Sequence, residues 1–121
     1  MQRACIVLVS LLLFSCGPKS VSYRTQIQPI LTERCTRCHG EEVARGKILL
    51  TSYEALMSSR AVSGKAPLVI AGSPYQSRLY IVSSTNQAHF RMPPDTSTVV
   101  ALSRDELELL VKWIMQGAKD N

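Results

Sequence analysis

The apolar residues of this chain recur at helical spacing in several short stretches that are separated by polar loops. Between residues 23 and 35, Ile27, Ile30 and Leu31 share one side of a predicted helix. Pro29 lies inside this pattern, so it must start the helical turn or kink it. No segment of useful length alternates between apolar and polar residues, so strands are not expected. The pattern predicts an all-α domain that is rich in loops.

The helix that begins after Ser103 is the most clearly predicted element. Ser103 and Glu106 have the spacing of a capping box, in which each side chain satisfies a backbone N–H of the other residue. Gly117 can end the helix in the left-handed conformation. The apolar stripe between these ends consists of Leu107, Leu110, Val111 and Ile114, with Trp113 flanking it.

Two shorter helices are expected in the middle of the chain. Ser52 can cap a helix over residues 53–57, and Ser73 with Pro74 marks the N-cap and first position of another. The side chains of this second helix that should face inward are Leu79, Tyr80 and Val82. Residues 91–95 cannot be regular structure, because two successive prolines prevent helical and sheet hydrogen bonding.

The N-terminus is typical of an export signal. Arg3 precedes an apolar run over residues 6–14, which is shorter than the roughly 20 residues that a membrane-spanning helix needs. The run ends at Leu13-Phe14-Ser15-Cys16, which resembles a bacterial lipobox and predicts lipidation of Cys16. The alternative is ordinary secretion with cleavage near Ser15. We therefore expect a signal peptide over residues 1–15, a lipidated tether over residues 16–22 and one domain over residues 23–119.

The charge of the chain limits its partners. The net charge is +5 over 121 residues, and the basic residues are spread along the sequence rather than gathered in a stripe. Nucleic-acid binding is therefore not expected. We expect a monomer that binds redox partner proteins and is attached to a membrane through a lipid anchor.

Cys35-Thr36-Arg37-Cys38-His39 has the C-x-x-C-H pattern of covalent haem c attachment. The two sulfurs lie one helical turn apart, so both can reach the vinyl groups of one porphyrin, and His39 can bind the iron as an axial ligand. A zinc site would need two further ligands at their own spacing, and a thioredoxin-like pair would need a βαβ context. Neither is found, so the pattern predicts one covalent haem c; a structural disulfide is the alternative.

Four residues compete for the second axial position on the iron: Met57, Met92, Met115 and His89. Met57 and Met115 lie in predicted helices, where packing or surface roles are more typical. Met92 precedes two prolines that stiffen its backbone, so its thioether can be held at a fixed point. Met92 is the predicted ligand, and His89 is the alternative.

Four stretches make the chain resemble the bacterial class I cytochrome c domains, and above all the planctomycete-type cytochrome c subgroup. These stretches are residues 27–31 before residues 35–40, Gly72-Ser73-Pro74 with Ser77 and Leu79, Met92-Pro93-Pro94, and residues 110–114 with Gly117-Ala118. The resemblance implies a fold in which the first and last helices cross beside the haem. It also implies thioether attachment at Cys35 and Cys38, with His39 and Met92 as axial ligands. Gly46-Lys47 departs from the paired glycines of the subgroup.

These features predict an electron carrier rather than an enzyme. With both axial positions filled, the iron exchanges single electrons and binds no substrate. The expected location is the bacterial cell envelope, with a lipid anchor and a domain that faces the periplasm. The alternatives are a haem enzyme or a gas or redox sensor with a labile distal ligand, and a structural module in which the haem fills a core.

Overall fold

The computed structural model describes residue 17 and residues 19–121. The predicted signal peptide and Cys16 lie outside the described residues. Within them, the chain forms seven short helical elements and no strand, which confirms the all-α, loop-rich expectation. The elements in chain order are η1 (Tyr23–Ile27), α1 (Gln28–Arg34), η2 (Arg45–Lys47), α2 (Tyr53–Ser58), η3 (Pro74–Gln76), α3 (Arg78–Ser84) and α4 (Arg104–Met115).

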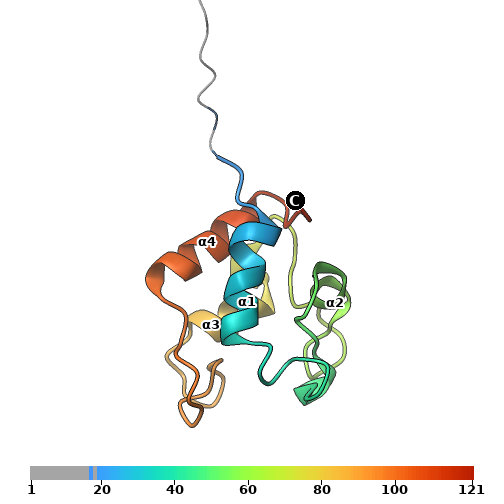
Figure 1. The fold of residues 1–121 in the computed structure, drawn as a ribbon, viewed down its shortest axis with the longest axis vertical. Helices are drawn as coiled ribbons and strands as arrows, with labels where there is room; N and C mark the ends of the chain where they lie inside the picture. The colour runs from blue at the N-terminus through green and yellow to red at the C-terminus, as the bar shows by residue number, and fades with distance from the viewer. Residues whose placement is uncertain (1–16, 18) are drawn as a thin grey trace, which may run out of the picture.

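The hydrophobic core forms where α4 packs against η1 and α3 (Figure 1). Trp113 of α4 is only 1% exposed, and its ring lies 5.4 Å from that of Tyr23. The ring of Tyr53 meets Tyr23 edge-on at 5.2 Å, which brings α2 into the same core. The sequence pattern treated Trp113 as a flank of the apolar stripe, whereas the structure puts it in the middle of the core.

The helix caps follow the sequence closely. The Ser103 hydroxyl accepts a hydrogen bond from the Glu106 N–H, and the Glu106 carboxylate accepts one from the Ser103 N–H, so the predicted capping box is confirmed. Ser52 caps α2 by accepting a bond from the Ala55 N–H. Gly117 follows α4 with a φ of 99°. These local signals therefore set where the helices begin and end.

The expected single helix after Ser73 is wrong. Pro74 begins only the short 3-10 turn η3, and Ser73 makes no side-chain cap. The chain then extends at Ser77 before α3 begins. The fully buried Ser77 hydroxyl accepts a bond from the Ile70 N–H and donates to the Ser73 carbonyl. This serine interrupts the helix because its side chain satisfies the backbone of the preceding loop.

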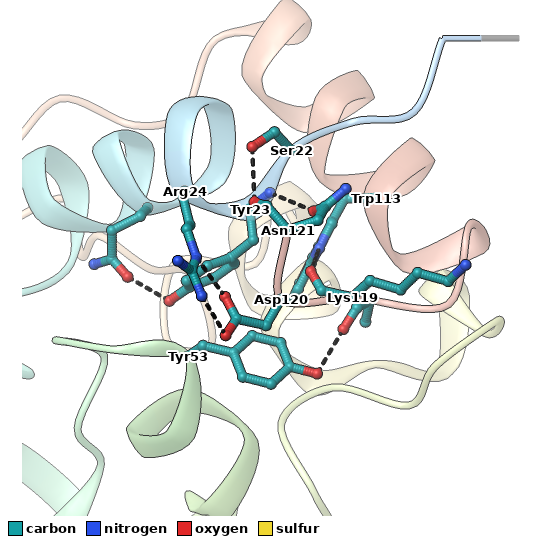
Figure 2. Close-up of polar contacts among 10 residues, drawn as sticks. Ser22, Tyr23, Arg24, Tyr53, Trp113, Lys119, Asp120 and Asn121 are labelled. Carbon is teal, nitrogen blue, oxygen red and sulfur yellow. Dashed lines mark hydrogen bonds and ion pairs between the residues drawn. The ribbon is translucent and has the colours of Figure 1, made fainter.

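The two ends of the described chain are hydrogen-bonded to each other (Figure 2). We call residues 20–24 and 116–121, with the bonds between them, the terminal clasp. The Asn121 side chain accepts a bond from the Tyr23 N–H at 2.9 Å, and its carbonyl accepts one from the Arg24 N–H at 3.0 Å. Asp120 pairs with the Arg24 guanidinium at 3.0 Å. The clasp lies at the end of the domain from which the N-terminal segment departs (Figure 1).

Candidate cofactor cavity

A cavity of about 610 Å³ is lined in part by the loops around η2 and before α4. These loops lie at the end of the domain away from the terminal clasp (Figure 1). The cavity lies among the end of α1, the loop that carries η2, helix α3 and the long loop before α4. Cofactor sites typically occupy about 300–1,000 Å³ and are mostly apolar, and this cavity meets both conditions. The apolar residues that line it are Ile48, Leu50, Ala61, Val62, Ala66, Leu68, Leu79, Val82, Phe90, Pro93, Pro94 and Val99.

Cys35 and Cys38 line this cavity directly after α1, and neither is joined in a disulfide. Their positions follow from the helix, because the Cys35 N–H still donates to the Leu31 carbonyl and the Cys38 N–H donates to Cys35. Burial raises the pKa of the Cys35 thiol to about 12, although the charge of Arg34 opposes this shift. Among the described residues, no group of three or more His, Cys, Asp or Glu side chains could hold a metal ion, so the pair lacks the further ligands that a zinc site needs.

His39 reaches the cavity with a defined proton position. Its Nδ1 lies 3.1 Å from the Arg45 carbonyl oxygen, so Nδ1–H donates and the Nε2 lone pair remains available to a metal. Burial lowers the pKa of His39, which favours the neutral ring that a metal ligand needs. The backbone is held on both sides, because the Leu50 N–H donates to the His39 carbonyl and the Arg45 N–H donates to the Cys38 carbonyl.

The loop after His39 contains one position where a side chain would not fit and two positions with a positive φ. A Cβ at Gly40 would overlap the Thr36 carbonyl oxygen, so only glycine fits there. Gly46 has a φ of 67° and Lys47 has a φ of 59°, both in the left-handed region. The backbone therefore adopts at Lys47 the conformation that glycine favours, although the side chain departs from the subgroup's paired glycines.

Met92 lines the same cavity and follows α3. Its N–H donates to the Val82 carbonyl at 2.8 Å, and the next residue, Pro93, is buried. These two contacts hold the backbone of Met92, as its neighbouring prolines predicted. Among the described residues that line the cavity, Met92 is the only methionine.

The other candidates for the axial position are arranged differently. His89 also lines the cavity, with its ring stacked 4.4 Å from that of Phe90. Met57 packs partly against the hydrophobic core, and Met115 is 61% exposed on α4. The cavity therefore brings together Cys35, Cys38, His39, Met92 and His89, and leaves the other two methionines outside.

The charged lining of the cavity is entirely basic among the described residues. Four arginines contribute to it, namely Arg34, Arg37, Arg45 and Arg78, and no Asp or Glu does. Arg37 also donates to the Thr98 hydroxyl at 3.0 Å, which ties the C-x-x-C-H segment to the loop after Met92. The sequence did not reveal these arginines as a group, because no motif contains all four and Arg78 lies far from the other three along the chain. Guanidinium groups bind carboxylates well, so the lining suits an apolar cofactor that carries carboxylates, as haem does.

An all-α fold whose loops enclose an apolar cavity beside C-x-x-C-H defines a cytochrome c-type domain. A family model described as planctomycete cytochrome C matches residues 35–96, which is half of the chain. The chain therefore belongs to the planctomycete cytochrome C family, as its sequence resemblance predicted. No curated protein and no solved structure gave a match.

Membership of this family defines the cofactor and the general role. The protein binds haem c covalently and has the electron-transfer role of a cytochrome c. Within the part of the chain that the structure describes, no helix is long and apolar enough to cross a membrane.

Proposed function

We propose that this protein is a membrane-anchored carrier of single electrons with one haem c. The observation that carries the proposal is that one cavity of about 610 Å³ brings Cys35, Cys38, His39 and Met92 together from two separate parts of the chain. When bound, haem c supplies the one-electron chemistry. The chain supplies the attachment, the axial ligands and the charges around the cavity.

Each of these residues has a proposed role that follows from its contacts. Cys35 and Cys38 would hold the haem through thioether bonds, and the Nε2 atom of His39 would bind the iron. The hydrogen bond from His39 Nδ1 to the Arg45 carbonyl fixes the orientation of the ring and raises the basicity of Nε2. Met92 would bind the iron through its sulfur, and such a thioether would stabilise the reduced iron and raise the reduction potential.

The proposal that the protein binds an acidic redox partner rests on its excess of basic residues. The arginines of the cavity neutralise the two carboxylates of the cofactor, and the basic residues left over attract an acidic redox protein. The carrier is proposed to act as a monomer.

The location rests on the N-terminal sequence. Residues 1–15 act as a signal peptide, Cys16 is lipidated, and the domain faces the periplasm of the bacterial cell envelope. A single acyl chain anchors only weakly, so stable attachment requires the complete lipoprotein modification.

The test is the spectrum of protein that has been matured in a bacterial periplasm. We expect haem colour to remain with the chain on a denaturing gel, and a low-spin visible spectrum with a near-infrared sulfur-to-iron band. Loss of colour on the gel would exclude covalent attachment. A high-spin or five-coordinate spectrum would instead favour an enzyme or a gas sensor.

A further inference from the structure

The point at which the chain enters the folded domain is fixed by several contacts. Val21 is 6% exposed, and its N–H donates to the Gln116 side chain at 2.8 Å. The Asn121 amide donates to the Ser20 hydroxyl at 3.2 Å, and the Ser22 hydroxyl donates to the Asn121 carbonyl at 2.8 Å. The segment that precedes the domain is therefore fastened from Ser20 onwards. Figure 2 shows the contact of Ser22 with Asn121 in this clasp.

Little chain remains between this fastening and the proposed anchor. Ser20 follows Cys16 by four positions. A fully extended chain spans at most about 3.6 Å per residue, so the fastened backbone lies within roughly 14 Å of Cys16. A lipid on Cys16 would hold the clasp close to the headgroups of the bilayer.

The clasp and the cavity lie at opposite ends of the domain. In Figure 1 the N-terminal segment and the end of α4 lie at the top, whereas η2 and the loop that precedes α4 lie at the bottom. Those lower segments line the cavity, whose exposed rim includes Val62, which is 81% exposed, and Phe90, which is 46% exposed. A short tether at one end therefore leaves the cavity at the other.

The clasp end also suits a negatively charged lipid surface. Lys19, Lys112 and Lys119 are exposed there, and no described ion pair of the structure includes a lysine. Met115, on the same last turn of α4, is 61% exposed. Lysines beside an apolar side chain are favourable at the surface of an anionic membrane.

We propose that the terminal clasp is the membrane-facing surface of the protein, and that it holds the cavity open toward the side away from the bilayer. This inference rests on the proposed lipid anchor at Cys16. The clasp converts a flexible point of attachment into a fixed orientation. The face that is left free for redox partners is then the cavity rim.

Photocrosslinking tests the orientation. The haem-loaded lipoprotein is placed on vesicles of phosphatidylcholine and phosphatidylglycerol that contain a lipid with a photoreactive headgroup, and crosslinked peptides are identified by mass spectrometry. We expect crosslinks at residues 17–24 and 112–121. We expect none at residues 60–66 and 86–94, which belong to the cavity end. Equal labelling at both ends, or labelling mainly at the cavity rim, would overturn the inference.

Two variants sharpen this test. A flexible Gly-Ser insertion after Gly17 leaves the clasp intact but lengthens the tether, so crosslinks should appear at the cavity rim. Changing Gln116 and Asn121 together to Ala removes the side chains that bind Ser20 and Val21, so the tether lengthens by these two residues and crosslinks should begin to appear at the cavity rim. The matched control changes Asn86 and Gln87 to Ala, because these exposed amides lie outside the clasp. Unchanged crosslinks in the insertion variant would show that the short tether does not set the orientation.

Chemical coupling of the protein to vesicles tests its orientation independently of the proposed lipid anchor in cells. In the haem-loaded protein that begins at Cys16, this residue has the one remaining free thiol, which can be coupled to a maleimide lipid in vesicles. Crosslinks at the clasp end then support the orientation even if the cellular protein does not partition with membranes. Crosslinks at the cavity rim of the coupled protein would overturn it even if the cellular protein is lipidated.

Discussion

Arg34 and Glu106 are joined by an ion pair of 3.1 Å between Nη2 and Oε1, across the junction of α1 and α4. Arg34 directly precedes Cys35, and Glu106 is also the acid of the capping box of α4. One carboxylate therefore connects the start of the C-x-x-C-H segment to the start of the last helix. Both side chains are less than one-fifth exposed, so the pair is partly shielded from solvent.

We expect Glu106→Gln to lower the free energy of unfolding by about 1–3 kcal/mol, since charged hydrogen bonds of this kind contribute on that order. Urea unfolding of the haem-loaded protein at neutral pH measures the loss. The matched control is Glu108→Gln, which removes an exposed helical pair with Arg104 and should change stability far less. Equal losses in the two variants would contradict the role given to Glu106.

The same carboxylate predicts an acid dependence of stability. Burial alone raises the pKa of Glu106, but the Ser103 N–H and the Arg34 guanidinium outweigh it, so the pKa lies below its ordinary value. A carboxyl group whose pKa is lower in the folded state than in the unfolded state stabilises the protein at pH values above its unfolded-state pKa, near 4.3. This stabilisation is lost as the pH falls through the folded-state pKa. The gap in stability between the natural protein and Glu106→Gln should narrow at acid pH. A gap that stays constant in acid would exclude this carboxylate as its source.

We expect Met92→Ala to abolish the near-infrared sulfur-to-iron band and to lower the reduction potential, because the thioether no longer stabilises the reduced iron. Carbon monoxide binding should appear, since a position on the iron becomes free. Met57→Leu and Met115→Leu are the matched controls, because neither side chain lines the cavity. A sulfur-ligated spectrum in Met92→Ala would refute the assignment, and bis-histidine features in the natural protein would point to His89.

Cys16→Ser should release the protein from the membrane fraction, because the variant lacks the thiol that the proposed lipid modifies. Fractionation of cells that express each form, followed by detection of the haem, measures this change. Ser20→Ala alters the tether without touching the proposed lipidation site and should remain with the membranes. Membrane association of the Cys16→Ser protein would disprove the anchor.

Lys47→Gly should stabilise the protein by about 0.5–1 kcal/mol, because a left-handed residue with a Cβ costs more than glycine loses in chain entropy. Lys65→Gly is a suitable control, since Lys65 is a loop lysine without a positive φ. It should have a neutral or slightly destabilising effect. Thermal unfolding compares the two variants, and a destabilised Lys47→Gly would show that the lysine side chain compensates for its backbone.

Local structure could be predicted from the sequence where near neighbours along the chain determine it. The Ser103–Glu106 capping box and the Ser52 cap need only residues three apart, so their spacing is visible in the chain. The sequence did not predict the interruption at Ser77, because the partner of this hydroxyl is the backbone of Ile70 in a preceding loop. The central position of Trp113 was also not predicted, because the ring that packs against Trp113 belongs to Tyr23, which is far away along the chain.

In the candidate site, too, the local motifs could be predicted from the sequence, whereas the contacts between distant segments could not. C-x-x-C-H and Met-Pro-Pro are local motifs, and the sequence identified their residues directly. The Arg45 carbonyl that orients His39 is a backbone atom in a loop, and any residue type could supply it. The tie between Arg37 and Thr98 joins segments that approach only when the loop before α4 folds over the cavity. Such contacts depend on the tertiary structure, and no periodicity in the sequence encodes them.

The terminal clasp has a consequence for the order of events as the chain is made. Residues 20–24 cannot complete their hydrogen bonds until residues 116–121 have been synthesised, and Trp113 reaches the core only at that late stage. Cys35 and Cys38 therefore emerge long before the domain can close around them. Because the closed domain leaves both cysteines only partly exposed, this interval of unfinished folding is when the machinery that attaches the cofactor has its freest access to both sulfurs.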